Sequence, residues 1–110
     1  MRVERGSSEA KGWYVGPWNS GLAISIGYAN EGIDEPHFHE ATTEIYLVAR
    51  GNCQVRVGDE VVHLEANDMI VVEPGEIHTF VSRSPGSRHT VSFLAIPAQL
   101  ESLAYSEFAA

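Results

Sequence analysis

The sequence predicts a single all-β domain, and three observations carry this prediction. Gly and Pro recur at short intervals along the 110-residue chain, which holds 10 Gly and 5 Pro. Short runs rich in β-branched and aromatic residues lie between them, at the spacing typical of an antiparallel sandwich or barrel. Residues 22–28 alternate large apolar and small side chains, which is the period of a strand. A chain of this length holds one core, so no separate cofactor domain is expected.

The strands are expected wherever an apolar run ends at a turn signal. Gly51-Asn52 and Gly58-Asp59 are such signals, and they predict a meander of hairpins in the middle of the chain. The run at 69–72 lacks polar residues, so we expect it to be buried on both faces. The expected strands are residues 22–28, 44–50, 53–57, 61–64, 69–72, 79–82 and 90–96, with a loop at 83–88.

The two ends of the chain differ from this pattern. Residues 1–21 carry Trp13, Tyr14 and Trp18 among glycines, and we expect no regular core element there. This N-terminal arm would pack on its own barrel or on a dimer partner. Residues 97–110 place apolar side chains at helical spacing, which fits a short docked helix or a frayed tail. The predicted division is therefore an arm at 1–21, a barrel at 22–96 and a tail at 97–110.

Charge and cysteine content exclude several classes of function. The chain has 15 acidic and 7 basic residues, a net charge of −8, which disfavours nucleic acid and anionic membrane surfaces as partners. The longest apolar run, Ile45–Ala49, is far too short to span a bilayer. Met1–Arg5 leads into no apolar segment of the kind found in secretory signals. One cysteine forms no intramolecular disulfide, which fits a cytoplasmic location.

Three histidines and one glutamate have the spacing of a metal site. His37 and His39 are two residues apart, so on a strand both imidazoles point to one face. Glu44 follows after enough residues for a turn into the next strand, and His78 begins a strand after Pro74-Gly75. Three imidazoles and a carboxylate suit one divalent transition metal: Fe, Mn, Ni, Co, Cu or Zn.

These residues also carry a resemblance to a known family. The pattern His37-x-His39-x4-Glu44-x6-Gly51, followed by Pro74-Gly75-x2-His78, resembles the two signature motifs of the cupin superfamily. The second motif departs from the family at turn and packing positions, with Asn67-Asp68 in place of Gly-Asp and Ser82 in place of Asn. The resemblance covers residues 22–96. It implies a small antiparallel jelly-roll barrel that holds one divalent metal on His37, His39, Glu44 and His78, and it implies a homodimer.

Strand parity extends the predicted site beyond the four ligands. Tyr46 shares a face with Glu44, and Phe80 shares a face with His78, so both would line a pocket or pack in the core. Tyr46 also offers a phenol for hydrogen bonding. Glu40 and Glu76 either orient a ligand imidazole or remain solvated.

The remaining histidines and the cysteine are expected to have no part in the chemistry. His63 and His89 match neither motif, and we expect them on the surface or the barrel exterior. Cys53 is expected to be a small buried apolar residue.

Three classes of function fit this site. Four protein ligands on a six-coordinate ion leave two positions for small molecules, which favours a metal-dependent oxidoreductase of the dioxygenase kind. The alternatives are a metal-dependent isomerase or lyase of a sugar or keto acid, and a binding module without turnover. Heavily anionic substrates are disfavoured because basic residues are few, and Arg83 and Arg88 are expected in a loop.

Overall fold

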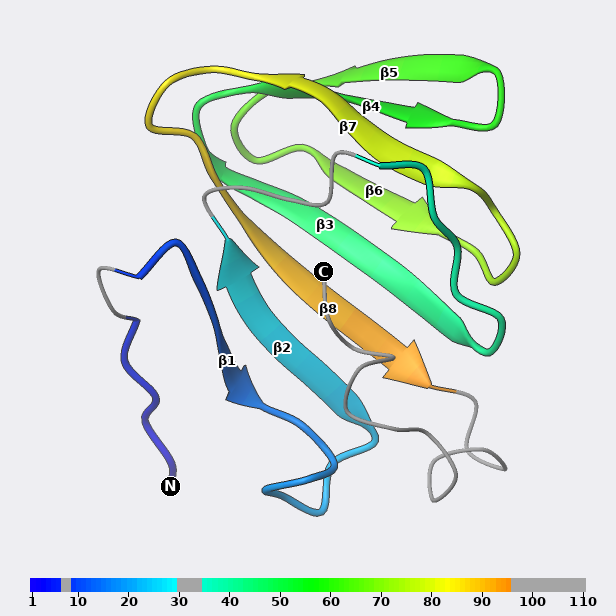
Figure 1. Ribbon diagram of the computed structural model, residues 1–110. Helices are drawn as coiled ribbons and strands as arrows, with labels where there is room; N and C mark the ends of the chain where they lie inside the picture. The colour runs from blue at the N-terminus through cyan, green and yellow to red at the C-terminus, as the bar shows by residue number, and fades with distance from the viewer. Residues whose placement is uncertain (7–8, 30–34, 96–110) are drawn as a thin grey trace.

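The computed structural model describes residues 1–6, 9–29 and 35–95, which form eight β-strands (Figure 1). In chain order they are β1 (Lys11–Val15), β2 (Ile24–Ala29), β3 (Thr42–Arg50), β4 (Cys53–Val57), β5 (Glu60–Leu64), β6 (Met69–Val72), β7 (His78–Arg83) and β8 (Arg88–Ala95). The predicted all-β class is confirmed, and the seven expected strands are found with ends shifted by a few residues. The expected tail helix at 97–110 lies outside the described residues.

The strands form two antiparallel sheets. The larger has the order β1-β2-β8-β3-β6, and the smaller has the order β5-β4-β7 (Figure 1). After β3 the chain crosses between the sheets from β3 to β4 and again at each connection from β5 to β8. This alternation is that of a jelly-roll barrel, as the motifs implied.

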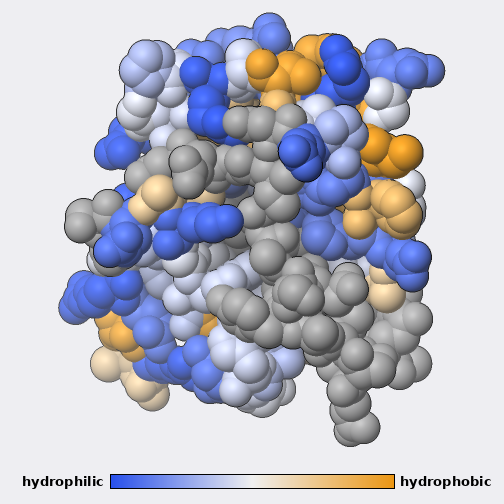
Figure 2. All heavy atoms as spheres, viewed as in Figure 1, coloured by the Kyte–Doolittle hydropathy of each residue, from blue (hydrophilic) through white to orange (hydrophobic). Residues whose placement is uncertain are grey.

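The two sheets enclose a small core. Its buried side chains come from both sheets and are Tyr46, Val48, Cys53, Val55, Leu64, Val72 and Phe80. Cys53 is 4% exposed, so the prediction that it is a buried apolar residue is confirmed. The described residues contain no helix long and apolar enough to cross a membrane. Among the described residues on the face shown in Figure 2, polar side chains predominate, with separate apolar groups near its upper, right and lower left margins.

The expectation of no regular element in the arm is wrong for residues 11–15. These residues form β1, which pairs with β2 of the same chain at the edge of the larger sheet. Trp13 lies opposite Gly27 and packs against the core. A Cβ on Gly27 would lie 2.6 Å from the carbonyl oxygen of Gly12 and 2.9 Å from the Trp13 ring. The glycine therefore makes room for the indole, and the indole supplies the apolar area that holds this strand.

The prediction that β6 is buried on both faces is also wrong. Met69 is 58% exposed and Val71 is 41% exposed, whereas Val72 is buried and Ile70 packs against the core. The reason is position, because β6 is the last strand of the larger sheet and only its inward-facing side packs on the core among the described residues.

Candidate metal centre

The structure brings together the four side chains that the motifs single out. One donor atom from each of His37, His39, Glu44 and His78 lies within 4.8 Å of all the others. Glu44 comes from β3, His78 begins β7, and His37 and His39 belong to the segment before β3. Three of the four are buried, at 7% exposed for His39, 0% for Glu44 and 2% for His78.

Backbone hydrogen bonds hold the histidine segment against β7. The amide of His37 donates to the carbonyl of His78 at 3.1 Å, and the amide of His78 donates to the carbonyl of His37 at 2.9 Å. The amide of Gly75 donates to the carbonyl of His39 at 2.8 Å. Gly75 has φ +86°, a conformation that glycine adopts without strain. The Pro74-Gly75 turn therefore positions both His39 and His78.

Two imidazoles are oriented by backbone carbonyls. Nδ1 of His37 lies 3.0 Å from the carbonyl oxygen of Glu35, and Nδ1 of His78 lies 3.0 Å from that of Glu76. A protonated Nδ1 donates to the carbonyl, and Nε2 is then the coordinating atom. Glu76 thus contributes its main chain, while its carboxylate accepts from the amide of Glu73 at 2.8 Å. Glu40 is exposed, as in the solvated alternative.

Glu44 is the electrostatic centre of the group. Its Oε1 accepts a hydrogen bond from the Tyr46 hydroxyl at 2.7 Å, and it lies 2.6 Å from Nε2 of His78 and 3.7 Å from Nε2 of His39. Burial alone would lower the pKa of His78, but the hydrogen bonds to Glu44 and to the Glu76 carbonyl raise it overall. Burial and the neighbouring Glu44 charge hold the pKa of Tyr46 well above its usual range. Tyr46 is therefore a neutral hydrogen-bond donor.

The chemistry of the donor set fits a divalent cation. Among the described residues, the buried atoms Nε2 of His37 and Oε2 of Glu44 have no hydrogen-bond partner. An unsatisfied buried polar atom costs about 1–3 kcal/mol, and more when it is charged. A cation among the four donors would satisfy both atoms and offset the buried carboxylate charge.

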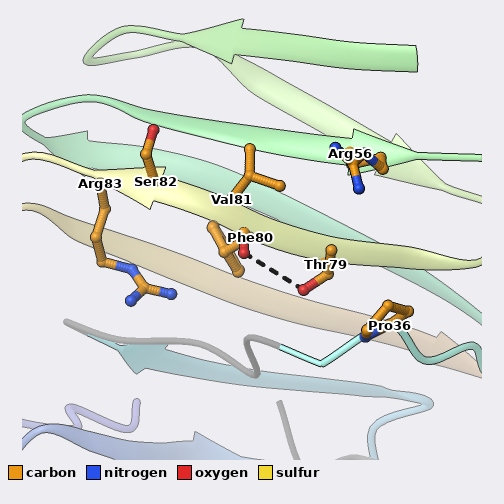
Figure 3. A pocket seen from close by; sticks show the side chains of 7 residues that line it. All are labelled: Pro36, Arg56, Thr79, Phe80, Val81, Ser82 and Arg83. Atoms are coloured by element: carbon orange, nitrogen blue, oxygen red, sulfur yellow. Dashed lines mark hydrogen bonds between the residues drawn. The ribbon is translucent and has the colours of Figure 1, made fainter. Parts of the chain in front are cut away.

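Tyr46 and Phe80 belong to the buried core next to the four donors. Both are buried, and their rings meet edge to face with centroids 5.1 Å apart. Phe80 also lines a hollow of about 410 Å³ at β7 (Figure 3). Contact of either residue with a ligand stays a prediction.

The expected exterior position of His89 is wrong. Its side chain is in the barrel, 4% exposed, stacked on Phe80 at 4.8 Å and edge-on to Tyr46 at 5.4 Å. Burial, aided by the charge of Arg83 and opposed by Glu44, lowers the pKa of His89 to about 4. The sequence held a signal for this placement, because His89 has the parity of the apolar residues in the alternating run 89–93. His63 is half-exposed and contacts Glu65 at 2.7 Å, as expected of a surface residue.

Comparison with known families decides the relationship. Residues 20–106 match the AraC-like ligand-binding domain family. The chain belongs to this family. It is a small cupin domain, as the motifs implied.

Solved structures of the same fold cover most of the chain. A cupin protein from Bacteroides fragilis has 16% identity and a TM-score of 0.66, over 94% of this chain and 93% of the other. A cupin 2 conserved barrel domain protein from Salinispora arenicola has 10% identity and a TM-score of 0.69, over 93% and 94%. A Streptomyces PAC13 variant with uridine has 19% identity and a TM-score of 0.61, over 84% and 76%. A search of the curated proteins finds no match to this sequence.

Proposed function

We propose that this cupin domain binds one divalent transition metal through His37, His39, Glu44 and His78 and acts as a metal-dependent oxidoreductase of the dioxygenase kind on a small organic molecule. The observation that carries this proposal is the convergence of the four donors within 4.8 Å. The unsatisfied Nε2 of His37 and Oε2 of Glu44 support it.

The number of donors favours chemistry over a purely structural role. Four protein ligands on a six-coordinate ion leave two positions for an organic molecule and dioxygen. The ion would supply redox or Lewis-acid chemistry at these positions. A structural metal site would more often be closed by its protein ligands.

The protein's own residues would fix the geometry around the ion. The carbonyls of Glu35 and Glu76 fix the two imidazole rings, and the Tyr46 hydroxyl fixes the Glu44 carboxylate. Tyr46 is a neutral phenol and would donate a hydrogen bond, not accept a proton, at neutral pH. The buried rings of Tyr46 and Phe80 would keep the core next to the four donors apolar.

The family match favours a second candidate, a domain that binds a small molecule without turnover. Both candidates bind the metal and a small molecule, and only the first converts that molecule into a product. Metal-loaded protein, screened with catechols, β-diketones, thiols and keto acids in an oxygen electrode, should consume oxygen with at least one of them. Turnover that persists under nitrogen would instead indicate an isomerase or lyase. Binding without turnover in either gas would favour the second candidate.

The outer face of the larger sheet supports a further part of this proposal, a homodimer. Leu47 lies opposite Met69 and Ile45 lies opposite Val71 on neighbouring strands, and three of these four side chains are at least 40% exposed. An exposed apolar strip on the outer face of a sheet favours association with a second copy. Light scattering should give twice the 12.0 kDa chain mass. The mass of one chain would contradict the dimer.

A further inference from the structure

A hollow of about 410 Å³ lies along β7, at the side of the barrel where the histidine segment passes (Figure 3). Its walls come from β4, β7 and the segment before His37. The lining residues are Pro36, Arg56, Thr79, Phe80, Val81, Ser82 and Arg83. This volume is enough for a small organic molecule.

The hollow has the opposite charge to the rest of the protein. Arg56 and Arg83 face it from two different strands, and no carboxylate is among its described lining residues. Thr79 and Ser82 add hydroxyl groups, of which the Thr79 hydroxyl donates to the Phe80 carbonyl at 3.3 Å (Figure 3). Two of the 7 basic residues in a chain of net charge −8 thus line one concave surface, and they lie at its two ends (Figure 3).

Aromatic contacts hold one of the two guanidinium groups in place. The guanidinium carbon of Arg83 lies 5.0 Å from the centroid of the Phe80 ring, and His89 stacks on the same ring at 4.8 Å. A guanidinium over an aromatic face still donates hydrogen bonds through the edges of its plane. The Arg83 side chain is therefore already ordered before an anion binds. Less conformational entropy is lost on binding, which favours it.

The hollow adjoins the metal group through two segments of the chain. Pro36 directly precedes His37, and Thr79 directly follows His78, and the two histidines are joined by paired backbone hydrogen bonds. A molecule that fills the hollow therefore lies beside the segments that carry two of the four donors.

We propose that this hollow binds the oxyanion group, carboxylate or phosphate, of a small-molecule ligand through Arg83, with Arg56 at the other end of the hollow as a second, more distant positive charge. The oxyanion site itself requires no metal. Its role as part of a substrate site rests on the proposed function, and it narrows the substrate class to small organic acids or phosphate esters. It also revises the expectation that few cations disfavour anionic substrates, because Arg83 ends β7 and faces the hollow where a loop position was predicted.

The test is an NMR titration of the full chain with succinate and, separately, with inorganic phosphate, and with glycerol as the neutral control. Saturable shifts are expected at the amides of β7 and at the Nε–H of Arg83, and none with glycerol. Arg83→Gln should weaken binding at least about tenfold, since a charge-assisted hydrogen bond is lost. Arg56→Gln should weaken it by a smaller factor, about threefold, because this side chain is exposed.

The matched control is Arg50→Gln, which removes the same charge outside the hollow. Arg50 is exposed, and its Nε donates to the Gly86 carbonyl at 2.8 Å. Arg50→Gln should leave the affinity within about twofold of wild type. Arg83→Lys keeps the charge without the planar fork and should retain part of the affinity, which separates anion binding from a folding defect.

Running the titration with chelator-treated and with metal-loaded protein separates this inference from the proposed function. Binding in both forms supports the oxyanion site whatever the metal does. Succinate and phosphate affinities distinguish a carboxylate ligand from a phosphate ligand. The absence of saturable shifts with either anion would overturn the inference, as would an equal loss of affinity in Arg50→Gln.

Discussion

Replacing His89 by Phe should make the fold markedly less sensitive to acid. In the folded protein the pKa of His89 is about 4, because the imidazole is buried and lies near the Arg83 charge. In the unfolded chain it is close to 6.5. Between these two values the unfolded chain binds a proton that the folded protein does not, so stability is lost as the pH falls from about 6.5 to 4. At about 1.4 kcal/mol per tenfold change in proton affinity, the loss is about 3 kcal/mol.

The assay is urea unfolding at a series of pH values from 7 to 4, on wild type and on His89→Phe. The difference in unfolding free energy between the two proteins should shift by about 3 kcal/mol in favour of the variant over this range. Taking the difference removes the contribution of groups that titrate in both proteins, such as His78. His63→Phe is the control, because His63 is half-exposed, and it should follow wild type. The same pH slope in wild type and His89→Phe would refute the buried, neutral state of His89.

Other predictions follow from single contacts. Tyr46→Phe removes the hydroxyl that donates to Glu44, and urea unfolding should show a loss of about 1.5–3 kcal/mol; an unchanged value would contradict the bond. Gly75→Ala should lower the free energy of unfolding by about 1–2 kcal/mol. The cause would be the backbone angle φ +86° alone, since an added Cβ meets no atom within 4 Å. The same substitution should weaken metal binding, because the amide of Gly75 holds the carbonyl of His39. Phe80→Ala should cost about 3–5 kcal/mol in the same assay. Metal affinity, measured by competition with a chromophoric chelator, should fall as the pH drops through about 6 because the imidazoles bind only when neutral; a flat profile would argue against histidine ligands.

Much of the fold was predictable because local chemistry and tertiary structure agree along β2 to β8. Glycines at the turns and the alternation of apolar and polar side chains identify most of these strands. Neither signal requires knowing which strands pair with each other. β1 was missed because Trp13, Tyr14 and Val15 follow one another without the alternation of a half-buried strand, and because Gly27, which makes room for Trp13, is fourteen residues away in the sequence. The exposure of Met69 was missed for a related reason, since the sheet edge is a property of strand order and not of the run itself.

The four donors were predictable because strand parity and the turn before β7 bring these sequence positions together. The inward orientation of His89 and Arg83 was not, because it is set by strand pairing with residues far away in the sequence. His89 lies opposite Val48, an inward-facing residue of β3, and Arg83 lies opposite the buried Cys53. A bulge between Gln54 and Val55 shifts the parity of β7, so simple alternation from Phe80 would turn Arg83 outward.

Elemental analysis of the protein, expressed in metal-replete medium and purified without chelators, tests the central claim most directly. We predict about one divalent transition-metal ion per wild-type chain, and a large loss of metal in His39→Ala with the fold retained by circular dichroism. His63→Ala, which removes a histidine outside the group, should keep the wild-type stoichiometry. Metal-free wild-type protein, or full metal content in His39→Ala, would contradict the account.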